Sequence, residues 1–314
     1  MSGKRCEWLS GDATGVARAA ELLRQGCLVA IPTETVYGLA ARADDPAAVA
    51  EIYRAKGRPD FNPLIVHVGS VRLARSLATF DSRAELLVER FWPGPVTLVL
   101  PLRRPSTIAP AVTAGLPTIA LRQPAHPVTA ALLEELGLPL AAPSANRSGR
   151  LSPTRAEHVR ASLGEAASAI LDGGASPRGM ESTIVALRED GSWQLLRPGP
   201  ITEDQLAALL GPATALGDAK IEAPGQLARH YSPGKPVRLN ALEPAGDEFM
   251  LGFGSVAGDT TLSADGDLAE AAARLYASLH EAAASEKPRV AVAPVPGEGI
   301  GVAINDRLRR AAAG

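Results

Sequence analysis

Cysteine is nearly absent from the sequence. Cys6 and Cys27 are the only two cysteines, and neither belongs to a CxxC motif or to a cysteine and histidine cluster. This argues against a disulfide framework, a zinc site or an iron–sulfur centre, and favours a reducing cytoplasm. No stretch approaches the roughly 18 apolar residues of a membrane span, and the first ten residues lack an apolar signal core. We therefore expect a soluble cytoplasmic protein with no membrane contact.

A strong net charge is also lacking, since the formal value at pH 7 is -2. Bulk charge gives no reason to expect attachment to nucleic acid, so any contact with tRNA would be local and weak. The sequence contains no Walker loop, no GxGxxG fingerprint, no Gly-x-Ser-x-Gly elbow and no second histidine at metal-ligand spacing. Hydrolase and metalloenzyme hypotheses therefore lack their residues.

What the sequence does contain is an α/β pattern across 314 residues, 46% of them hydrophobic. Helical spacing over 12–25 is followed by an apolar run at 27–31, and Asp45-Pro46 predicts the start of a helix through about residue 54. Further helices and strand-like runs alternate up to about residue 210. The pattern predicts a mixed α/β domain over 1–210, a glycine- and proline-rich linker over 211–236, and a small second α/β domain over 237–314 whose long helix spans 267–284.

The most informative segment runs from Lys56 to Pro63, KGRPDFNP. Lysine is scarce, with five among 32 basic residues, so Lys56 stands out. Proline disfavours helix in the residue before it, which predicts an extended strip that begins after the second helix. Side chains alternate along such a strip, so Lys56 and Arg58 would point to one side, where a phosphate is the usual ligand. The alternative is an ordinary solvated basic loop.

Other polar groups follow predicted strands. Arg122 closes TIALR, residues 142–149 close PLAA, Ser182 begins STIVAL, and Arg197 ends a later strand. Ligands of open α/β sheets bind in the crevice beyond strand ends, although each of these segments taken singly is also a normal turn. His67 interrupts the apolar run LIVHV, where a histidine is more often a core residue than a ligand.

The motifs PTETVYGLA, KGRPDFNPLIVH, PTIALRQP, SANRSGRLSPT, ESTIV, LLRPGPI and RHYSP occur in this order. Together they closely resemble the YrdC family in its two-domain form, the threonylcarbamoyl-AMP synthases. The C-terminal GIGVAINDRLRRAA resembles the end of the extra domain of that family. The resemblance implies a twisted mixed sheet with a concave, positively lined cavity, and a small Rossmann-like α/β domain behind it.

The resemblance also implies an activity. Members convert L-threonine, bicarbonate and ATP into threonylcarbamoyl-AMP and pyrophosphate, and a separate transferase complex passes the threonylcarbamoyl group to an adenosine of tRNA. The carbamate of threonine attacks the α-phosphorus of ATP, so positioning and charge stabilisation suffice and no covalent nucleophile is needed. Mg²⁺ would arrive with ATP, and no tightly bound prosthetic group is expected.

Site residues follow from the matching positions. The resemblance assigns Lys56 and Arg58 to catalysis and to the triphosphate. The further ATP contacts that it implies are Asn62, Thr118, Ser144, Ser152, Arg197 and Tyr231. Those that it implies for L-threonine are Thr35, His67, Arg122, Ala142 and Ser182. Arg122 would hold the substrate carboxylate, because a guanidinium binds one with two parallel hydrogen bonds.

The reactive intermediates require a water-free site, and the linker with Arg229, His230 and Tyr231 is the expected cover. Residues 223–228 read APGQLA where the family runs closer to SPGMKY, so contacts from 226–228 do not carry over. Two alternatives stay open. An RNA-binding module without turnover would bind tRNA in a salt-dependent way, and a carbamoyltransferase would use carbamoyl phosphate, although the zinc-finger cysteines of those larger proteins are absent here.

Overall fold

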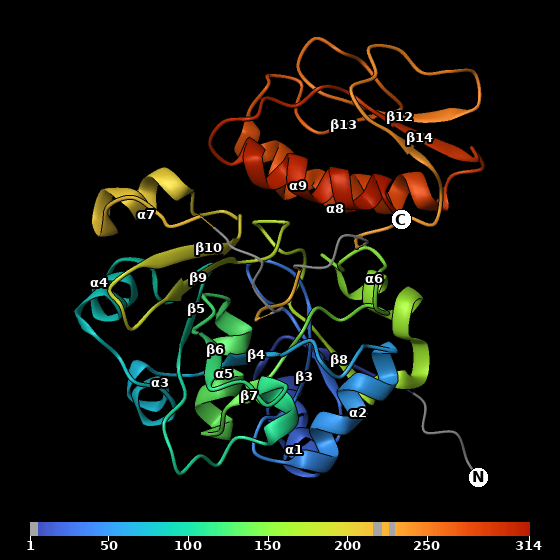
Figure 1. Cartoon of the computed structure of the whole chain (residues 1–314). Helices are drawn as coiled ribbons and strands as arrows, with labels where there is room; N and C mark the ends of the chain where they lie inside the picture. Colours follow the sequence, from blue (N-terminus) through green and yellow to red (C-terminus); the bar gives the residue numbers. More distant parts are fainter. Residues whose placement is uncertain (1–5, 216–221, 226–229) are drawn as a thin grey trace.

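The structure of the protein is a computed structural model that describes residues 6–215, 222–225 and 230–314. Within these residues the strands form two sheets, one of ten strands and one of four (Figure 1). The larger sheet has the order β1-β8-β2-β3-β7-β4-β6-β5-β9-β10 and mixes parallel with antiparallel neighbours. Its strands, in chain order, are β1 (Glu7–Ser10), β2 (Val29–Ile31), β3 (Gly38–Arg42), β4 (Ile65–His67), β5 (Val96–Pro101), β6 (Thr118–Arg122), β7 (Leu140–Ala141), β8 (Ala169–Asp172), β9 (Thr183–Leu187) and β10 (Trp193–Arg197).

Helices cover both faces of this sheet. Successive side chains of a strand point to opposite faces, and apolar side chains lie on both faces. In β2, Val29 and Ile31 pack with α1 and α5, whereas Ala30 faces the cluster that contains α2 and α4. The helical segments of this part of the chain are α1 (Ala13–Arg24), α2 (Pro46–Lys56), α3 (Val71–Leu77), α4 (Ser82–Phe91), η1 (Pro110–Thr113), α5 (Pro127–Leu136), α6 (Ala156–Leu163), η2 (Gly164–Ala166) and α7 (Glu203–Leu210).

The smaller sheet is parallel throughout its described pairs and has the order β11-β14-β12-β13. Two helices pack on it and lie between it and the larger part of the chain (Figure 1). The elements of this second domain are β11 (Val237–Arg238), β12 (Glu248–Gly252), β13 (Thr260–Thr261), α8 (Leu268–Ala284), β14 (Arg289–Val292) and α9 (Gly301–Ala312). The predicted fold class, a twisted mixed α/β sheet with a small second α/β domain, is confirmed.

Local sequence signals located several elements well. The Asp45 side chain accepts hydrogen bonds from the backbone N–H groups of Ala47 and Ala48, as expected of an N-cap, and Pro46 begins α2. The sequence expectation was wrong at the other end of this helix. α2 continues through Lys56, and Gly57 closes it in the left-handed conformation at φ 59°. Lys56 is therefore helical, and the alternation of an extended strip does not set its direction.

Several short elements were not expected from the sequence. The first strand is Glu7–Ser10 rather than 27–31, and β3, β8 and α3 had no predicted counterpart. Among the residues that the structure describes, none of the helices combines the length and apolar character that crossing a bilayer requires.

Candidate active site

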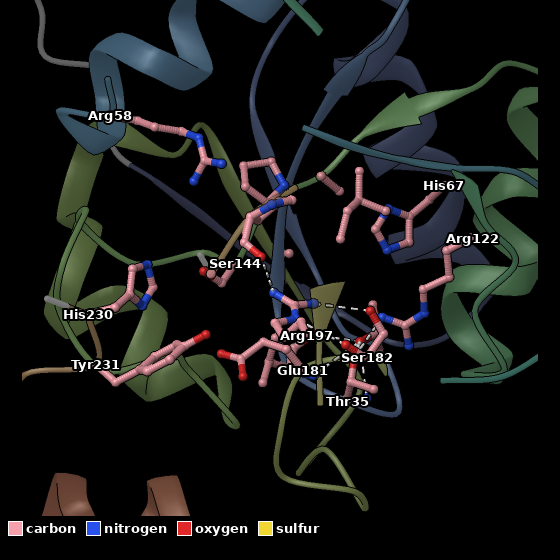
Figure 2. A pocket seen from close by; sticks show the side chains of 18 residues that line it. Thr35, Arg58, His67, Arg122, Ser144, Glu181, Ser182, Arg197, His230 and Tyr231 are labelled. Atoms are coloured by element: carbon pink, nitrogen blue, oxygen red, sulfur yellow. Dashed lines mark hydrogen bonds between the residues drawn. The ribbon is translucent and has the colours of Figure 1, made fainter. Parts of the chain in front are cut away.

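A small enclosed cavity lies where the ends of β4, β6, β7 and β9 meet the segments 224–225 and 230–231 (Figure 2). Its volume is about 40 Å³, which is room for about three water molecules. Its lining comprises Thr33, Thr35, Val36, Gly38, Arg58, Ile65, His67, Arg122, Ala142, Pro143, Ser144, Glu181, Ser182, Arg197, Pro224, Gly225, His230 and Tyr231. The lining includes all the residues that are predicted to contact L-threonine, namely Thr35, His67, Arg122, Ala142 and Ser182.

Sheet register brings two of these residues together. β4 and β6 are parallel neighbours, and His67 pairs directly with Arg122. The two side chains consequently project side by side at one wall of the cavity (Figure 2). Burial, reinforced by the Arg122 charge, lowers the pKa of His67 to about 3, so the imidazole is neutral at physiological pH.

Arg122 is held in place by the segment that follows β2. Its Nη2 donates to Oε1 of Glu34 at 2.6 Å and its Nη1 donates to Oγ1 of Thr35 at 2.8 Å, while its Nε donates to the Gly94 carbonyl at 3.2 Å. These bonds use three of the five N–H groups of a guanidinium. Glu34 therefore orients Arg122 and balances part of its charge.

The remaining polar residues after β2 build the turn itself. Oγ1 of Thr33 donates to the Val36 carbonyl at 2.6 Å and accepts from the backbone N–H groups of Thr35 and Val36. The hydroxyl of buried Tyr37 donates to the Gly174 carbonyl at 2.7 Å. Thr33 and Tyr37 thus stabilise the turn through their hydroxyls, and Thr33 and Thr35 both line the cavity.

Three cations surround the opposite wall. Arg58 and Arg197 line the cavity directly. Burial lowers the pKa of Arg58 to about 10 and also lowers that of Arg197. Lys56 is buried behind the lining, where its Nζ donates to the carbonyls of Ser144, at 2.5 Å, and Asn146. Burial, and then the Arg58 charge, lowers the pKa of Lys56 well below its usual range.

Four of the residues predicted to contact ATP do not line the cavity in the described part of the chain. They are Lys56, Asn62, Thr118 and Ser152. Asn62 lies next to Arg58, whose Nε donates to the Asn62 carbonyl at 3.1 Å. Thr118 begins β6, at the opposite end from Arg122. Oγ of Ser152 donates to Oε1 of Glu181, a residue of the cavity wall. Their contacts with ATP remain predictions.

The linker contributes one wall of the cavity through Pro224, Gly225, His230 and Tyr231. Tyr231 is 1% exposed and has a φ of 63°, and its ring contacts that of His230 with 4.1 Å between centroids. Burial lowers the pKa of His230 to about 3. Arg229 and residues 226–228, which the sequence analysis also considered, lie outside the described residues.

Buried polar atoms without a partner mark several of these side chains. Among the described residues, Nδ1 of His67, Nδ1 of His230 and Oδ1 of Asn62 have none. A buried acceptor or donor without a partner is costly and indicates a bound ligand or water. No group of three or more acidic, histidine or cysteine side chains in the described chain is placed to hold a metal ion.

Sequence reasoning assigned no site role to several residues of the cavity wall, among them Glu181 and Gly225. Glu181 stands in the quoted motif ESTIV next to Ser182, so the signal was present without an assigned role. Gly225 is identified only by geometry. Its φ is +88°, and a Cβ there would lie 2.8 Å from Cδ of Arg197 and 3.2 Å from the Tyr231 hydroxyl.

The fold and the cavity together define a two-domain α/β protein with a small cavity lined by arginine, histidine and hydroxyl side chains. Comparison with known families agrees with this class. Residues 21–199 match the family model described as "Telomere recombination", and residues 201–313 match the model of the threonylcarbamoyl-AMP synthase C-terminal domain. The chain belongs to the threonylcarbamoyl-AMP synthase family.

Individual relatives cover nearly the whole chain. The threonylcarbamoyl-AMP synthase of Bacillus subtilis is 41% identical over 98% of this chain and 95% of its own length. That of Pyrococcus abyssi is 38% identical over 93% of this chain and 92% of its own length. The crystal structure of P. abyssi Sua5 complexed with L-threonine superposes with a TM-score of 0.87 at 35% identity, covering 98% of this chain and 97% of that one.

Proposed function

We propose that this chain forms threonylcarbamoyl-AMP and pyrophosphate from L-threonine, bicarbonate and ATP. The observation that carries the proposal is that all five residues expected to contact threonine line one cavity together with Arg58, Ser144, Arg197 and Tyr231. These residues come from segments scattered between residues 35 and 231. Such distant positions would not be expected to line one cavity unless they shared a role. Full-length similarity to threonylcarbamoyl-AMP synthases supports the same reaction.

The wall formed by β4, β6 and the turn after β2 suits threonine. Arg122, oriented by Glu34, would bind the substrate carboxylate with its remaining N–H groups. The unpartnered Nδ1 of neutral His67 and the hydroxyls of Thr35 and Ser182 would contact the amine and hydroxyl of threonine. A site that hydrogen-bonds a substrate hydroxyl rejects analogues without it by roughly 10⁴-fold or more, so valine would be excluded.

The opposite wall suits ATP. In Figure 2, Arg58, His230 and Tyr231 lie across the cavity from His67 and Arg122, with Arg197 between the two groups. The amine of threonine would first add to carbon dioxide with loss of a proton, or to bicarbonate with loss of water, to form a carbamate. One carbamate oxygen would then attack the α-phosphorus, and the bond to the bridging oxygen would break as pyrophosphate leaves. Arg58, Arg197 and Lys56 would stabilise the charge that develops on the phosphates.

Mg²⁺ would enter with ATP, bound to its phosphates and sharing their charge. The two carboxylates nearest the cavity do not compete for it, because Glu34 is paired with Arg122 and Glu181 with Arg307. The Ser144 and Ser152 hydroxyls and the Asn62 amide are within the same region and would contact the nucleotide. Thr118, which begins β6, would contact the nucleotide only if part of the nucleotide extended along that strand.

The linker over 211–236 would exclude water during the reaction. A cavity of about 40 Å³ is far below the roughly 300–1,000 Å³ of ordinary ligand pockets, so ATP can enter only if lining residues move. Pro224, Gly225, His230 and Tyr231 are the lining residues that the linker contributes. The domain over 1–210 would then carry catalysis and that over 237–314 would anchor the linker. The product would pass, in the cytoplasm, to a transferase complex that modifies tRNA.

The test is pyrophosphate release by the purified full-length chain with ATP and Mg²⁺. L-threonine is compared with L-valine and L-serine, and each reaction is repeated in solution freed of carbon dioxide and bicarbonate. We expect release only when threonine and bicarbonate are both present, with threonylcarbamoyl-AMP detected by mass spectrometry. Release that never depends on threonine would refute the proposed function, and a salt-dependent titration with tRNA would then test the RNA-binding alternative.

A further inference from the structure

Glu181, in the cavity wall, is bound from the second domain. Arg307 of α9 donates from Nε to Oε2 of Glu181 at 3.1 Å, and the Tyr276 hydroxyl of α8 lies 3.1 Å and 3.0 Å from the two carboxylate oxygens. On the first-domain side, the Ser152 hydroxyl donates to Oε1. Both oxygens of Glu181 are therefore engaged, which leaves it a poor candidate for a proton acceptor or a substrate ligand.

Arg307 contacts two further segments of the site. Its Nη1 donates to the carbonyl of Pro198 at 2.8 Å, directly after the cavity residue Arg197. Its guanidinium lies over the Tyr231 ring, 5.5 Å from the centroid. One side chain of α9 thus touches three separate segments of the cavity wall, at 181, 197–198 and 231.

Both partners of the contact between Arg307 and Glu181 are buried, so each affects the electrostatics of the other. Arg307 is 0% exposed and Glu181 is 5% exposed. Burial works to raise the pKa of Glu181, but the charges of Arg307 and Arg197 and the Ser152 hydrogen bond lower it below its usual value. Glu181 is therefore a carboxylate in the wall of a site for an anionic nucleotide, and Arg307 balances its charge.

The rest of the loop before β9 is also held from the second domain. Met180 is fully buried in the hydrophobic cluster that contains Tyr276 and Tyr231. Gly179 has a φ of +64°, and a Cβ at this position would lie 2.1 Å from the Ala273 carbonyl of α8. Only glycine lets the loop approach the helix so closely.

We propose that Arg307 is a positioning residue of the synthase, through which the second domain holds Glu181, the Arg197–Pro198 segment and Tyr231 in the arrangement that binds ATP. The inference rests on the proposed function and extends it to a residue that does not line the cavity. The segments at 181 and 197–198 are already joined by hydrogen bonds from Arg197 to Ser182, and Arg307 joins both of them to Tyr231. Loss of Arg307 should consequently weaken the binding of ATP more than the binding of threonine. The threonine contacts expected on β4, β6 and the turn after β2 lie outside the three segments that Arg307 touches.

The first test is the Arg307→Met variant, which keeps an unbranched apolar side chain and removes the charge and the donors. We expect the KM for ATP to rise about tenfold or more, because truncating one partner of a buried pair is costly. The KM for threonine should stay within about threefold of the wild-type value, since of its expected contacts only Ser182 adjoins the segments that Arg307 holds. Arg309→Met, an exposed arginine of the same helix, is the matched control and should behave as wild type.

A second pair of variants separates positioning from stability. Arg307→Lys keeps the charge but loses the forked geometry, so it should recover only part of the ATP affinity. The double variant Glu181→Gln/Arg307→Met removes both buried charges and should recover melting temperature. If Arg307 only stabilises the fold, the double variant would also regain the wild-type KM for ATP. That result, or an unchanged KM in Arg307→Met, would overturn the inference.

Hydrogen exchange gives a readout that does not depend on turnover. Backbone amides of residues 230–236 should exchange faster in Arg307→Met than in wild type or Arg309→Met, because Tyr231 loses its partner. Should wild type show no threonine-dependent pyrophosphate release, the proposed function fails, and this exchange comparison still decides whether Arg307 positions the linker. Equal exchange in all three proteins would reject the positioning role while leaving the synthase assignment intact.

Discussion

Gly225→Ala tests whether the linker must close against Arg197 for ATP to bind. Gly225 has a φ of +88°, a conformation that costs an L-residue roughly 1–2 kcal/mol. The added methyl group would also stand 2.8 Å from Cδ of Arg197 and 3.2 Å from the Tyr231 hydroxyl. Arg197 cannot move away easily, because its Nε and Nη2 donate to the Ser182 carbonyl and hydroxyl.

These two penalties apply only to the closed arrangement. Backbone strain of about 1–2 kcal/mol and a further 1–2 kcal/mol for displacing packed side chains give roughly 2–4 kcal/mol. If closure accompanies ATP binding, the apparent affinity falls by the same free energy, which corresponds to about 30-fold to several-hundred-fold. The change should appear in the KM for ATP, since the side chains that a Cβ at Gly225 would meet belong to Arg197 and Tyr231, both expected ATP contacts.

Initial rates of pyrophosphate release, with ATP and threonine varied separately, measure this effect. Gly246→Ala is the matched control, because a Cβ at Gly246 would meet no atom within 4 Å and the residue has no positive φ. An ATP KM within twofold of wild type in Gly225→Ala would show that the described position of Pro224–Gly225 is not the one in which ATP is bound. The reasoning on closure would then be refuted.

Three further outcomes follow from the other walls of the cavity. Arg122→Lys keeps the charge but loses the paired donors, so we expect the KM for threonine to rise about 30-fold with little change for ATP in the same initial-rate assay. Lys56→Ala and Arg58→Ala should each lower kcat for pyrophosphate release by about 100-fold or more, because each removes a cation from the phosphate side. Because burial lowers the pKa of Lys56, the unfolded chain binds more protons than the folded chain between that lowered pKa and about 10.4. The free energy of unfolding, from urea titrations at pH 7 to 9, should therefore rise with pH in wild type relative to Lys56→Met.

Matched controls exist for each of these variants. Arg75→Lys and Arg75→Ala make the same changes in an exposed pair with Glu85 and should leave the kinetics unchanged. Lys235→Ala removes another lysine that donates to two carbonyls, those of Ala282 and Ser285, without touching the cavity. A loss of activity in Lys235→Ala equal to that in Lys56→Ala would remove Lys56 from the mechanism. Parallel pH profiles of wild type and Lys56→Met would contradict the argument on its pKa.

The sequence by itself determined the features that depend on neighbouring residues. Asp45 and Pro46 begin α2 because the cap and the fixed φ of proline act within one turn. The predicted helix over 267–284 corresponds to α8, whose first turn is capped by the Asp267 side chain as it accepts hydrogen bonds from the N–H groups of Ala269 and Glu270. The same local rules failed at Lys56, where the helix continues two residues further than predicted and a left-handed Gly57 ends it. Short strands such as β8 carry too few residues for a period to be visible.

Only the tertiary structure decided which distant groups meet. The register between β4 and β6 sets His67 beside Arg122, and the pairing of Glu34 with Arg122 joins positions far apart in sequence. Arg307 reaches Glu181 across 126 positions. Such pairs depend on the packing of whole sheets and domains. The free energy of that packing is summed over many apolar contacts, so the pairing cannot be inferred from either residue or its sequence neighbours alone. The sequence therefore indicated candidate site residues, and the fold decided which of them share a cavity and what holds them there.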